Sequence, residues 1–587
     1  MYRSHTCNDL RLDDKGVEVT LSGWVHRRRD HGGVIFIDLR DRYGLTQIVS
    51  DPENFKDAHE KMDSVRSEYV LKIEGEVLER SGGENPALDS GKIEILVKDV
   101  EVLNKSKTPP FEIDQDKEVG EDLRLTYRYL DLRRGRMKKN IMLRHKMIKF
   151  VRDRLEEEDF VEVETPILIK GTPEGSREYL VPARMHPGSF YVLPQSPQQL
   201  KQLLMVAGFD RYFQVARCFR DEDQRGDRQP EFTQLDMEMS FVEEKDIMKI
   251  NEKILLEITK KFAPQKKIKE EVFPVLTYDE AMNVYGSDRP DLRFDLPLSD
   301  ISDIAAECDF GVFKGAVDAG GVVKVLRVEG GAKFTRKEID GFEVVAKNHG
   351  AKGLAYIVVE KELRSPIVKF FKEDELEAIL ERCGAKEGDI IFFSADKFAT
   401  ACESIGHVRL AIGEKLGMID PELFAFCWVN DFPMFEEDNE TGQLSAVHHP
   451  FTAPQDPADL EDSPGTSIAK AYDVILNGNE IGGGSIRIHE ESVQKRVFDI
   501  LSITEEDAKS RFGHLLRAFE YGAPPHGGIA WGLDRLVMIF ADEPNIREVI
   551  AFPKDQKARD LMLGAPSEMP ADQVEELHVK VIAKKDA

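Results

Sequence analysis

The sequence predicts an α+β protein of several domains, and three observations support this fold class. The chain has 587 residues, which corresponds to about three to five domains of ordinary size. Hydrophobic residues make up 41% and charged residues 32%, a composition typical of folded globular proteins and not of disordered or collagen-like chains. Short β-rich runs fill residues 15–103, whereas the rest mixes strand-like runs with helical patterns such as 198–207 and 242–262.

No segment of the sequence predicts a membrane span or a secreted protein. Every apolar run is shorter than the roughly 18 residues that a spanning helix needs. Met1–Thr6 carries no apolar segment after its charge, so we expect no secretory signal. The six cysteines are scattered and form no C-x-x-C pair, which indicates reduced thiols and no disulfide or zinc framework. We therefore expect a cytoplasmic protein without a membrane partner.

The charge is strongly acidic overall but basic in one segment. There are 81 Lys and Arg against 109 Asp and Glu, a net charge of −28, which argues against indiscriminate nucleic-acid binding. Residues 123–154 nevertheless hold twelve Lys or Arg against two Asp. Clustered cations attract polyanions, so we interpret this segment as a phosphate-facing surface. A solvated helix face is the alternative.

Five strand-like runs lie close together at the start of the chain and predict a small barrel. They cover 17–25, 34–39, 45–49, 69–77 and 92–103. Five strands in so short a stretch suit the OB-fold, whose sheet face commonly binds single-stranded nucleic acid. Any other small β-barrel is the alternative.

Three further segments carry residue types suited to phosphate or carboxylate binding. Phe219–Glu222 follows a strand-like run and offers a guanidinium fork beside carboxylates. Asp473 and Glu480 precede the glycine stretch 482–484, and neighbouring carboxylates hold hard cations such as Mg²⁺. Gly527–Arg535 is typical of a strand that breaks into a helix. Each segment also has a purely structural interpretation: in the order given, a surface ion pair, solvated acids and a buried ion pair. No G-x-x-x-x-G-K-[ST] motif is present, so a nucleotide site here is not a P-loop.

Together these segments resemble the bacterial-type aspartyl-tRNA synthetases, a family of class II aminoacyl-tRNA synthetases, over nearly the whole chain. The three motifs of the class stand in order as Phe160–Pro166, Phe219–Phe232 and Gly532–Arg535. Features of the aspartate type stand at 123–134, 195–201, 228–236 and 448–451. One departure is Gln199-Leu200, where many relatives have Leu-Phe.

The resemblance implies an architecture of five parts. They are an OB-fold anticodon-binding domain at 1–106, a linker or hinge at 107–140, a class II catalytic domain with an antiparallel sheet at 141–285 and 416–560, an α/β insertion (GAD) domain of bacterial type at 286–415, and a C-terminal extension at 561–587. Motif 1 further implies a homodimer.

The implied activity is ATP-dependent ligation of L-aspartate to tRNA through aspartyl-adenylate, with Mg²⁺ as cofactor. The residues implied for ATP are Arg220 at the α-phosphate, Glu222 at the adenine, Gln229 beside the nucleotide, Arg535 at the γ-phosphate, and Gly532, Leu533 and Asp534 of motif 3. Asp473 and Glu480 would hold Mg²⁺ that bridges the phosphates.

The implied aspartate pocket consists of charged and polar residues from several segments. Its members are Glu174, Gln198, Lys201, Arg220, Asp236, His448, His449 and Arg487. Lys201 and Arg487 would recognise the second carboxylate of the substrate, which neutral asparagine lacks. Glu174, on a loop that closes over the substrate, would hold the α-ammonium with Gln198 and Asp236. One of the two histidines would approach a substrate carboxylate, and the choice between them stays open.

The resemblance also assigns tRNA recognition to the barrel. Phe36 would stack on an anticodon base, and Arg29 and Gln47 would contact base edges. At His31, Gly82 and Gly83 the sequence resembles relatives that charge both tRNA(Asp) and tRNA(Asn), which have such residues at these positions.

We therefore expect a non-discriminating enzyme whose product on tRNA(Asn) needs an amidotransferase. One alternative is a synthetase strictly specific for tRNA(Asp). The other is an inactive RNA-binding paralogue, which predicts the loss of Arg220, Glu480 or Arg535, and all three are present.

Overall fold

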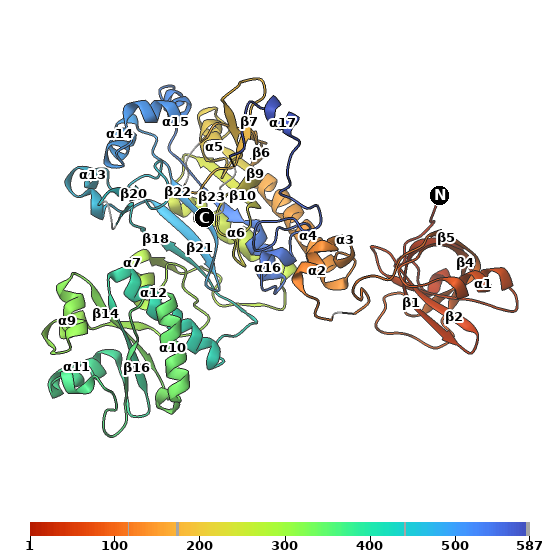
Figure 1. The fold of residues 1–587 in the computed structure, drawn as a ribbon, viewed down its shortest axis with the longest axis horizontal. Helices are drawn as coiled ribbons and strands as arrows, with labels where there is room; N and C mark the ends of the chain where they lie inside the picture. The colour runs from red at the N-terminus through yellow and green to blue at the C-terminus, as the bar shows by residue number, and fades with distance from the viewer. Residues whose placement is uncertain (116, 172–174, 439–441, 583–587) are drawn as a thin grey trace. The chain divides into compact units, whose positions relative to one another are not determined.

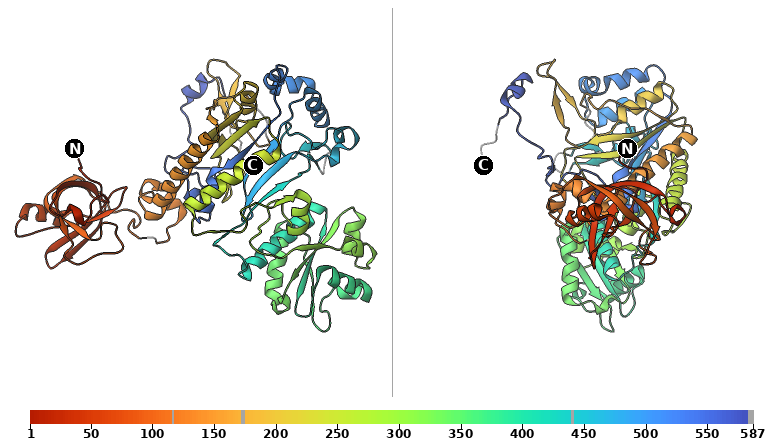
Figure 2. Two further views of the ribbon diagram at one scale, coloured as in Figure 1. Left: turned by 180° about the vertical axis from the view of Figure 1, so that it is seen from behind. Right: turned by 90° about the vertical axis from the view of Figure 1, so that its right-hand side faces the viewer.

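The computed structural model describes residues 1–115, 117–171, 175–438 and 442–582. The chain forms two compact units. One comprises Met1–Met142 and Ala551–Ser567, and the other comprises Leu143–Ile550 and Glu568–Ala587. Figures 1 and 2 trace the chain from three directions. Among the described residues, every helix is too short or too polar to traverse a lipid bilayer.

A closed five-stranded barrel forms the N-terminal part of the first unit (Figure 1). Around the barrel the strands are β1 (Glu18–His31), β2 (Val34–Arg40), β3 (Leu45–Val49), β5 (Ile93–Asn104) and β4 (Val70–Glu79), and α1 (Lys56–Ser64) lies between β3 and β4 in sequence. Buried and more exposed side chains alternate along β2, so that Ile35, Ile37 and Leu39 fill the interior. The predicted OB-fold barrel is confirmed.

The basic segment after the barrel is helical, and much of its charge is paired internally. Its helices are α2 (Glu121–Thr126), α3 (Arg128–Asp131) and α4 (Gly135–Glu157). The buried carboxylate of Asp131 accepts hydrogen bonds from Arg128 at 2.6 Å, Arg134 at 3.3 Å and Arg124 at 3.4 Å. The interpretation of 123–154 as a phosphate-facing surface is therefore wrong for these three arginines, because they converge on a carboxylate buried within the fold.

An eight-stranded sheet forms the centre of the second unit. Its strands lie in the order β12 (Val275–Thr277), β18 (Phe426–Asn430), β21 (Ala471–Leu476), β22 (Asn479–Ile486), β23 (His526–Gly532), β10 (Glu231–Ser240), β9 (Arg211–Phe219) and β6 (Val161–Glu162). The six inner strands pair antiparallel, whereas each edge strand runs parallel to its neighbour. This is the predicted antiparallel catalytic sheet.

The core of this unit joins the sheet to helices from distant segments. Side chains of α4, α6 (Glu244–Phe262) and α16 (Leu533–Phe540) form one cluster with Trp428 and Trp531 of the sheet. The glycines of β22 and β23 allow these strands to lie close. A Cβ at Gly484 would collide with the carbonyl oxygen of Gly528 and lie 2.8 Å from the Tyr472 ring.

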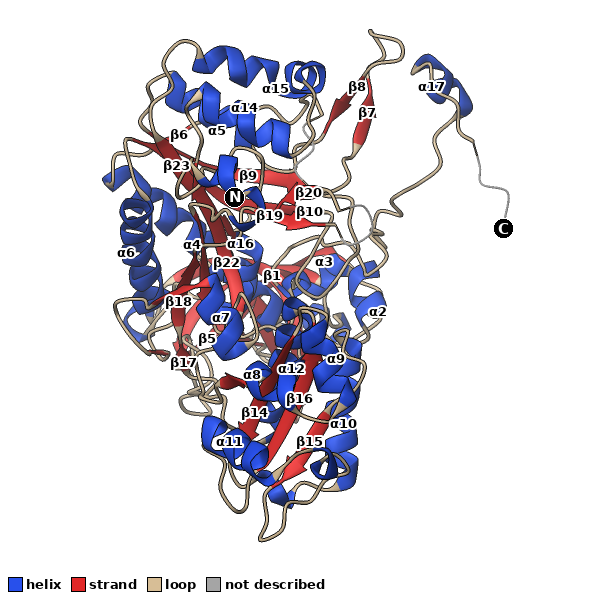
Figure 3. Cartoon of the chain, turned by 90° about the vertical axis from the view of Figure 1, so that its left-hand side faces the viewer, coloured by secondary structure: helices blue, strands red, loops and turns tan. Residues whose placement is uncertain are grey.

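Several shorter elements complete the second unit (Figure 3). They are the strand pairs β7 (Leu180–Pro182) with β8 (Phe190–Val192), β11 (Lys267–Ile268) with β17 (Leu423–Phe424), and β19 (Phe435–Glu437) with β20 (Leu444–Ala446), and the helices α5 (Gln198–Val206), α13 (Asp459–Asp462), α14 (Glu491–Ile500), α15 (Glu505–Phe519) and α17 (Ala571–Glu576).

The insertion has its own sheet and its own hydrophobic core (Figure 1). The sheet is antiparallel, in the order β13 (Leu298–Asp300), β14 (Val322–Val328), β16 (Ile390–Asp396) and β15 (Ala355–Val358), with the helices α8 (Ser302–Glu307), α9 (Gly311–Asp318), α10 (Arg336–Asn348), α11 (Glu373–Cys383) and α12 (Phe398–Lys415).

Two glycines bring the insertion against α7 (Tyr278–Tyr285) of the catalytic part. Gly286 ends α7 in the left-handed region, with φ of +69°. Gly406 lies within α12, and a Cβ there would collide with the Gly286 carbonyl oxygen. Helix α12 can therefore approach α7 this closely only with glycine at position 406.

We predict that Gly406→Ala lowers the free energy of unfolding by about 1–3 kcal/mol, because the added methyl overpacks this contact. The matched control is Gly341→Ala in α10, where nothing lies within 4 Å of a new Cβ. Alanine favours a helix interior by up to about 1 kcal/mol, so the control should be neutral or stabilising. Urea unfolding of both variants measures the difference, and equal effects would contradict the close-packing argument.

Candidate active site

Two adjoining cavities lie over the central sheet of the second unit, and the structure brings most of the predicted site residues into them. The larger has a volume of about 580 Å³, and its lining includes Gln198, Lys201, Arg220, Glu222, Asp236, His448, His449, Asp473, Glu480 and Arg487. The smaller has a volume of about 190 Å³, and its lining includes Arg220, Glu222, Gln229, Glu480, Gly532, Asp534 and Arg535. Because the two share Arg220, Glu222 and Glu480, they form one continuous cleft.

Four buried charges form the floor of the larger cavity. Lys201 of α5 donates to Asp236 at 2.7 Å and lies 3.2 Å from Glu238, both on β10. Arg487, just after β22, donates through Nε and Nη2 to the two oxygens of Glu238 at 2.9 and 3.2 Å. All four residues are at most 3% exposed. Charges this deeply buried are stable only in a paired arrangement, so these four groups hold one another in place.

Glu238 is a member of this quartet that the sequence analysis missed. It pairs with both predicted carboxylate-binding cations, and those cations lower the pKa of its carboxyl despite its burial. Its spacing in the sequence could have identified it as a site residue. Glu238 follows Asp236 by two residues on one strand and therefore points to the same face of the sheet.

The two histidines have different environments. His449 lies with Nε2 2.7 Å from Nη1 of Arg487, and its Nδ1 accepts from the backbone N–H of Phe451 at 3.1 Å. Burial, with the charge of Arg487 adding to it, holds the pKa of His449 well below its usual range. His448 instead lies 3.9 Å from the carboxylate of Asp473. His449 is therefore the histidine beside the quartet.

Three residues were predicted to hold an ammonium group. Gln198 and Asp236 both line the larger cavity, and Oδ2 of Asp236 is buried without a hydrogen bond from any described residue. Glu174 lies outside the described residues. The described part of this subsite therefore offers an unused acceptor to a cation.

Asp473 and Glu480 converge across Gly483. A Cβ built on Gly483 would lie 2.6 Å from Oδ1 of Asp473 and 3.7 Å from Oε1 of Glu480. Burial, and also the negative charge of Glu480, raises the pKa of Asp473 above its usual range. A cation at this point would relieve the repulsion. Within the described ranges no group of three or more metal-ligating side chains occurs.

The smaller cavity lies between two arginines. The guanidinium of Arg220 lies 5.1 Å from the centre of the Phe232 ring. Arg535 donates to Asp227 at 3.0 Å and to the backbone carbonyl of Glu480. Both guanidinium groups are thus held by contacts within the fold while they line the cavity. Asp227 is a further contact that the sequence analysis did not identify.

The remaining predicted residues of the smaller cavity surround this pair. Glu222 accepts from Arg228 at 3.1 Å, and Gln229 is 2% exposed. Leu533 belongs to the hydrophobic core, where its side chain is 1% exposed. The carboxylate of Asp534 accepts from the backbone N–H of Thr233 at 2.8 Å and pairs with Arg144. Asp534 thus fastens α16 to β10 and α4, and its partner is not the neighbouring Arg535 that one alternative named.

The predicted anticodon residues lie on the barrel of the first unit. The half-buried ring of Phe36 meets the His31 ring edge-on at 5.9 Å. Arg29 donates to both oxygens of Asp38 at 2.7 and 2.8 Å. Gln47 is only 4% exposed, because its amide is held by Arg80 and Glu94 within the barrel. Gln47 therefore contributes to a polar network, and among the residues predicted for tRNA recognition Phe36 and His31 present ring surface.

The three residues predicted to relax tRNA choice are all exposed. His31 ends β1, and Gly83 adopts a φ of +80°. Nothing described lies within 4 Å of a Cβ built on Gly82 or Gly83. The absence of side chains at these two positions leaves open space on the barrel.

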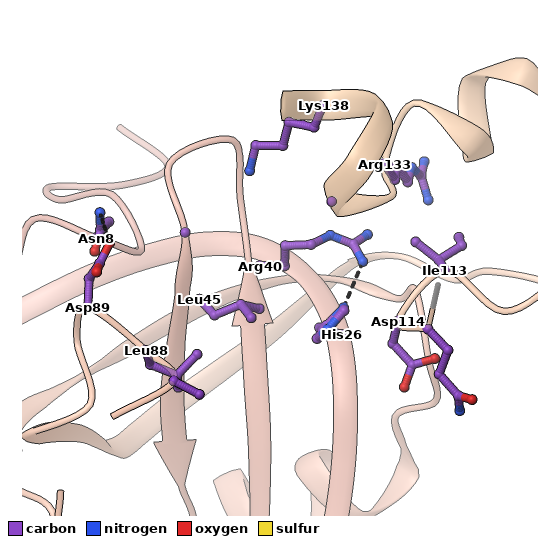
Figure 4. Close-up of a pocket in the computed structure, with 14 residues that line it drawn as sticks. Asn8, His26, Arg40, Leu45, Leu88, Asp89, Ile113, Asp114, Arg133 and Lys138 are labelled. Atoms are coloured by element: carbon purple, nitrogen blue, oxygen red, sulfur yellow. Dashed lines mark hydrogen bonds between the residues drawn. The ribbon is translucent and has the colours of Figure 1, made fainter. Parts of the chain in front are cut away.

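A separate cavity of about 360 Å³ lies in the first unit, beside the barrel (Figure 4). Arg40, Arg133 and Lys138 line it, and Arg40 also contacts Nδ1 of His26 at 3.0 Å. Both guanidinium groups donate to the carboxylate of Glu68, at 2.7 and 2.8 Å. Both guanidinium groups are thus held by one carboxylate, and no residue predicted for the site lines this cavity.

Comparison with known proteins gives matches over the whole chain. The family model described as tRNA synthetases class II (D, K and N) matches residues 120–556, and the one described as OB-fold nucleic acid binding domain matches residues 19–103. A protein of Rubrobacter xylanophilus is 52% identical over 99% of this chain and 97% of its own length, and one of Desulfatibacillum aliphaticivorans is 52% identical over 100% and 98%. Both are named aspartate–tRNA(Asp/Asn) ligase.

Solved structures show the same fold at lower identity. Asparaginyl-tRNA synthetase from Pyrococcus horikoshii has a TM-score of 0.59 at 18% identity and covers 94% of this chain and 98% of its own. A putative aspartyl-tRNA synthetase from Leishmania major has a TM-score of 0.58 at 19% identity and covers 94% of each chain. Motifs, fold and full-length similarity lead to one conclusion: the chain belongs to the class II tRNA synthetases (D, K and N), in the family of the aspartate–tRNA ligases.

Proposed function

We propose that this chain joins L-aspartate to tRNA in two steps, on both tRNA(Asp) and tRNA(Asn). The observation that carries the proposal is the continuous cleft, in which Arg220 and Glu480 stand between a pocket built around Lys201 and Arg487 and a cavity bounded by Phe232 and Arg535. An amino acid with two carboxylates fits the first part, and a nucleotide fits the second. The names of the relatives at 52% identity support the same substrates.

In the first step, an α-carboxylate oxygen of aspartate forms a bond to the α-phosphorus of ATP, and pyrophosphate leaves. This step requires positioning and charge neutralisation and no protein nucleophile. Arg220, at the junction of the two cavities, would stabilise the negative charge that builds on the α-phosphate. Glu222 and Gln229 would hold the adenine end, and Arg535 the γ-phosphate. In the second step, the terminal ribose hydroxyl of tRNA takes the aspartyl group and AMP leaves.

Asp473 and Glu480 fit a divalent cation, because their two carboxylates converge across Gly483, where no side chain fills the space. When bound, Mg²⁺ would neutralise phosphate charge. The task of the two residues is to hold it at the boundary of the two cavities, where Glu480 lies. Lys201 and Arg487 are instead paired with Glu238.

Recognition of the second carboxylate would take place between Arg487 and His449. The neutral ring of His449 has one acceptor nitrogen, whereas both of its neighbours, the N–H of Phe451 and Nη1 of Arg487, are donors. A substrate carboxylate oxygen that accepts from Nη1 of Arg487 would relieve this conflict. The amide of asparagine offers one acceptor and one donor, so we expect strong preference for aspartate.

On the barrel, Phe36 would stack on an anticodon base, with Arg29 and the Gln47 network at the base edges. The open space at Gly82 and Gly83 supports relaxed choice of the last anticodon base, the one that distinguishes tRNA(Asn) from tRNA(Asp). Aspartyl-tRNA(Asn) would then pass to an amidotransferase. The exposed Val161 of motif 1 and Ile167 directly after it suit an interface between two copies in a homodimer. The six free cysteines agree with a reducing cytoplasm.

The direct test is aminoacylation with labelled aspartate on separate tRNA(Asp) and tRNA(Asn) transcripts. We expect comparable kcat/KM for both, together with aspartate-dependent exchange of pyrophosphate into ATP. Charging of tRNA(Asp) alone would replace the relaxed assignment with a discriminating synthetase. Neither charging nor exchange would favour the inactive paralogue.

Arg487→Lys should lower kcat/KM for aspartate in pyrophosphate exchange by about 10²–10³, because lysine cannot hold Glu238 with two bonds and also reach the substrate. The control is Arg517→Lys on the exposed surface of α15, which should leave the rate unchanged. An equally small effect of both substitutions would remove Arg487 from the proposed pocket.

His31→Leu should reduce kcat/KM on tRNA(Asn) by about tenfold and leave tRNA(Asp) charging nearly unchanged, because the loss of one base contact costs about 1–3 kcal/mol. Phe36→Ala should weaken charging of both tRNAs, since stacking is tolerant of sequence. His186→Leu, at an exposed site in the second unit, is the control. A uniform loss on both tRNAs with His31→Leu would contradict its role in tRNA choice.

A further inference from the structure

Behind Gln198 lies a chain of buried polar side chains that reaches away from the substrate cavity. Nε2 of Gln198 donates to Oε1 of Gln202 at 3.2 Å, and Nε2 of Gln202 lies 3.0 Å from Nε2 of His526. Nδ1 of His526 lies 2.8 Å from the carbonyl oxygen of Pro524. Gln202 and His526 are both 0% exposed, and Gln198 is 7% exposed. Water therefore cannot replace any of these bonds.

The hydrogen bond between His526 and Pro524 determines which group donates and which accepts in each of the other bonds. A backbone carbonyl can only accept, so Nδ1 of His526 must carry a proton. Burial lowers the pKa of His526, so the ring is neutral at pH 7. A neutral imidazole has one donor and one acceptor, and Nε2 of His526 is therefore an acceptor.

This acceptor fixes both glutamines in turn. Gln202 must point its NH₂ group at His526, which leaves Oε1 of Gln202 to accept from Gln198. Gln198 must then use its NH₂ group toward Gln202. The side-chain oxygen of Gln198 is then the free end of this series of hydrogen bonds. No hydrogen bond to it occurs among the described residues.

This free oxygen belongs to a residue that lines the larger cavity together with Asp236. Oδ2 of Asp236 also lacks a hydrogen-bond donor in the described part of the chain. Two acceptors without donors, one neutral and one on a carboxylate, suit a ligand group that only donates. The α-ammonium of an amino acid is such a group, whereas a carboxylate or a phosphate is not.

We propose that His526 is a positioning residue, which locks the amide of Gln198 with its oxygen toward the α-ammonium of the substrate. The inference rests on the proposed function, since it concerns how the same pocket binds aspartate. His526 does not touch the substrate and acts only through Gln202 and Gln198. Without it both amides can turn over, and Gln198 can present NH₂ to the ammonium.

The backbone of His526 also makes a hydrogen bond that a substitution of the side chain does not remove. Its carbonyl oxygen accepts from the N–H of Arg487 at 2.9 Å, within the pairing of β22 and β23. A substitution at 526 therefore tests the imidazole and not the position of the carboxylate-binding arginine.

The experiment measures pyrophosphate exchange by His526→Leu and by Gln202→Met, which breaks the same chain with a side chain of similar length. Each should raise the KM for aspartate by about tenfold, the effect of losing one hydrogen bond to a charged group, with kcat and the KM for ATP nearly unchanged. Asn251→Leu replaces an equally buried polar residue in α6 and should alter none of these constants.

Succinate, which is aspartate without its amino group, separates the ammonium from the carboxylates. Its inhibition constant against aspartate should be the same in wild type and His526→Leu. A parallel loss of succinate and aspartate binding would show a general disturbance of the pocket and overturn the proposal. In a Gln198→Ala background His526→Leu should add nothing to the KM for aspartate, and full additivity would also overturn it.

Two measurements on the wild type keep the outcome clear. If wild type shows no aspartate-dependent exchange, the proposed function fails, and the inference about its ammonium subsite fails with it. If exchange occurs but the variants do not fold, ¹⁵N NMR of histidine-labelled wild type decides. A proton on Nδ1 of His526 with Nε2 unprotonated supports the chain, and the opposite tautomer refutes it.

Discussion

The pairing of four buried charges is the interaction on which the rest of the site depends. Lys201, Asp236, Glu238 and Arg487 come from α5, β10 and the end of β22, and each would be strongly destabilising if it were buried alone. Their mutual contacts therefore set the relative positions of three elements that are far apart in sequence. Glu238 is central because it contacts both cations. The pocket is thus rigid before a substrate arrives, which is what selective binding of a small dicarboxylate requires.

Close approach of backbones is the second constraint on the architecture. The glycines of β22 and β23 let the two strands and Tyr472 lie so near that a Cβ at Gly484 would collide with them. The same device operates at Gly483, where the missing side chain leaves room between Asp473 and Glu480. A glycine-rich strand is normally weakened by the lack of side chains to pack. Here the space is used by carboxylates and by the neighbouring strand.

The residues that touch ligands in the proposal were largely recognisable from the sequence, whereas those that support them were not. Arg220, Arg535 and Arg487 stand in motifs with distinctive neighbours, and all of them line the cleft. Asp227, Glu238 and His526 were missed, because the role of each depends on partners hundreds of residues away; only Glu238 had a local signal, its spacing from Asp236. The arginines at 124, 128 and 134 show the converse error. Their density suggested a surface for a polyanion, but all three donate to the buried carboxylate of Asp131 inside the fold.

By itself, the sequence determined the five-stranded barrel, the mixed fold class and the chemical types available in the cleft. These properties follow from local periodicity and from motifs in which the residues that matter are neighbours. Only the tertiary structure decided which of the two histidines lies beside Arg487, that Asp534 fastens α16 and is not paired with Arg535, and that Gln47 is held inside a network. The physical reason is the same in each case. A polar side chain takes the partner that burial brings to it, and burial is a property of the folded chain that no local pattern contains.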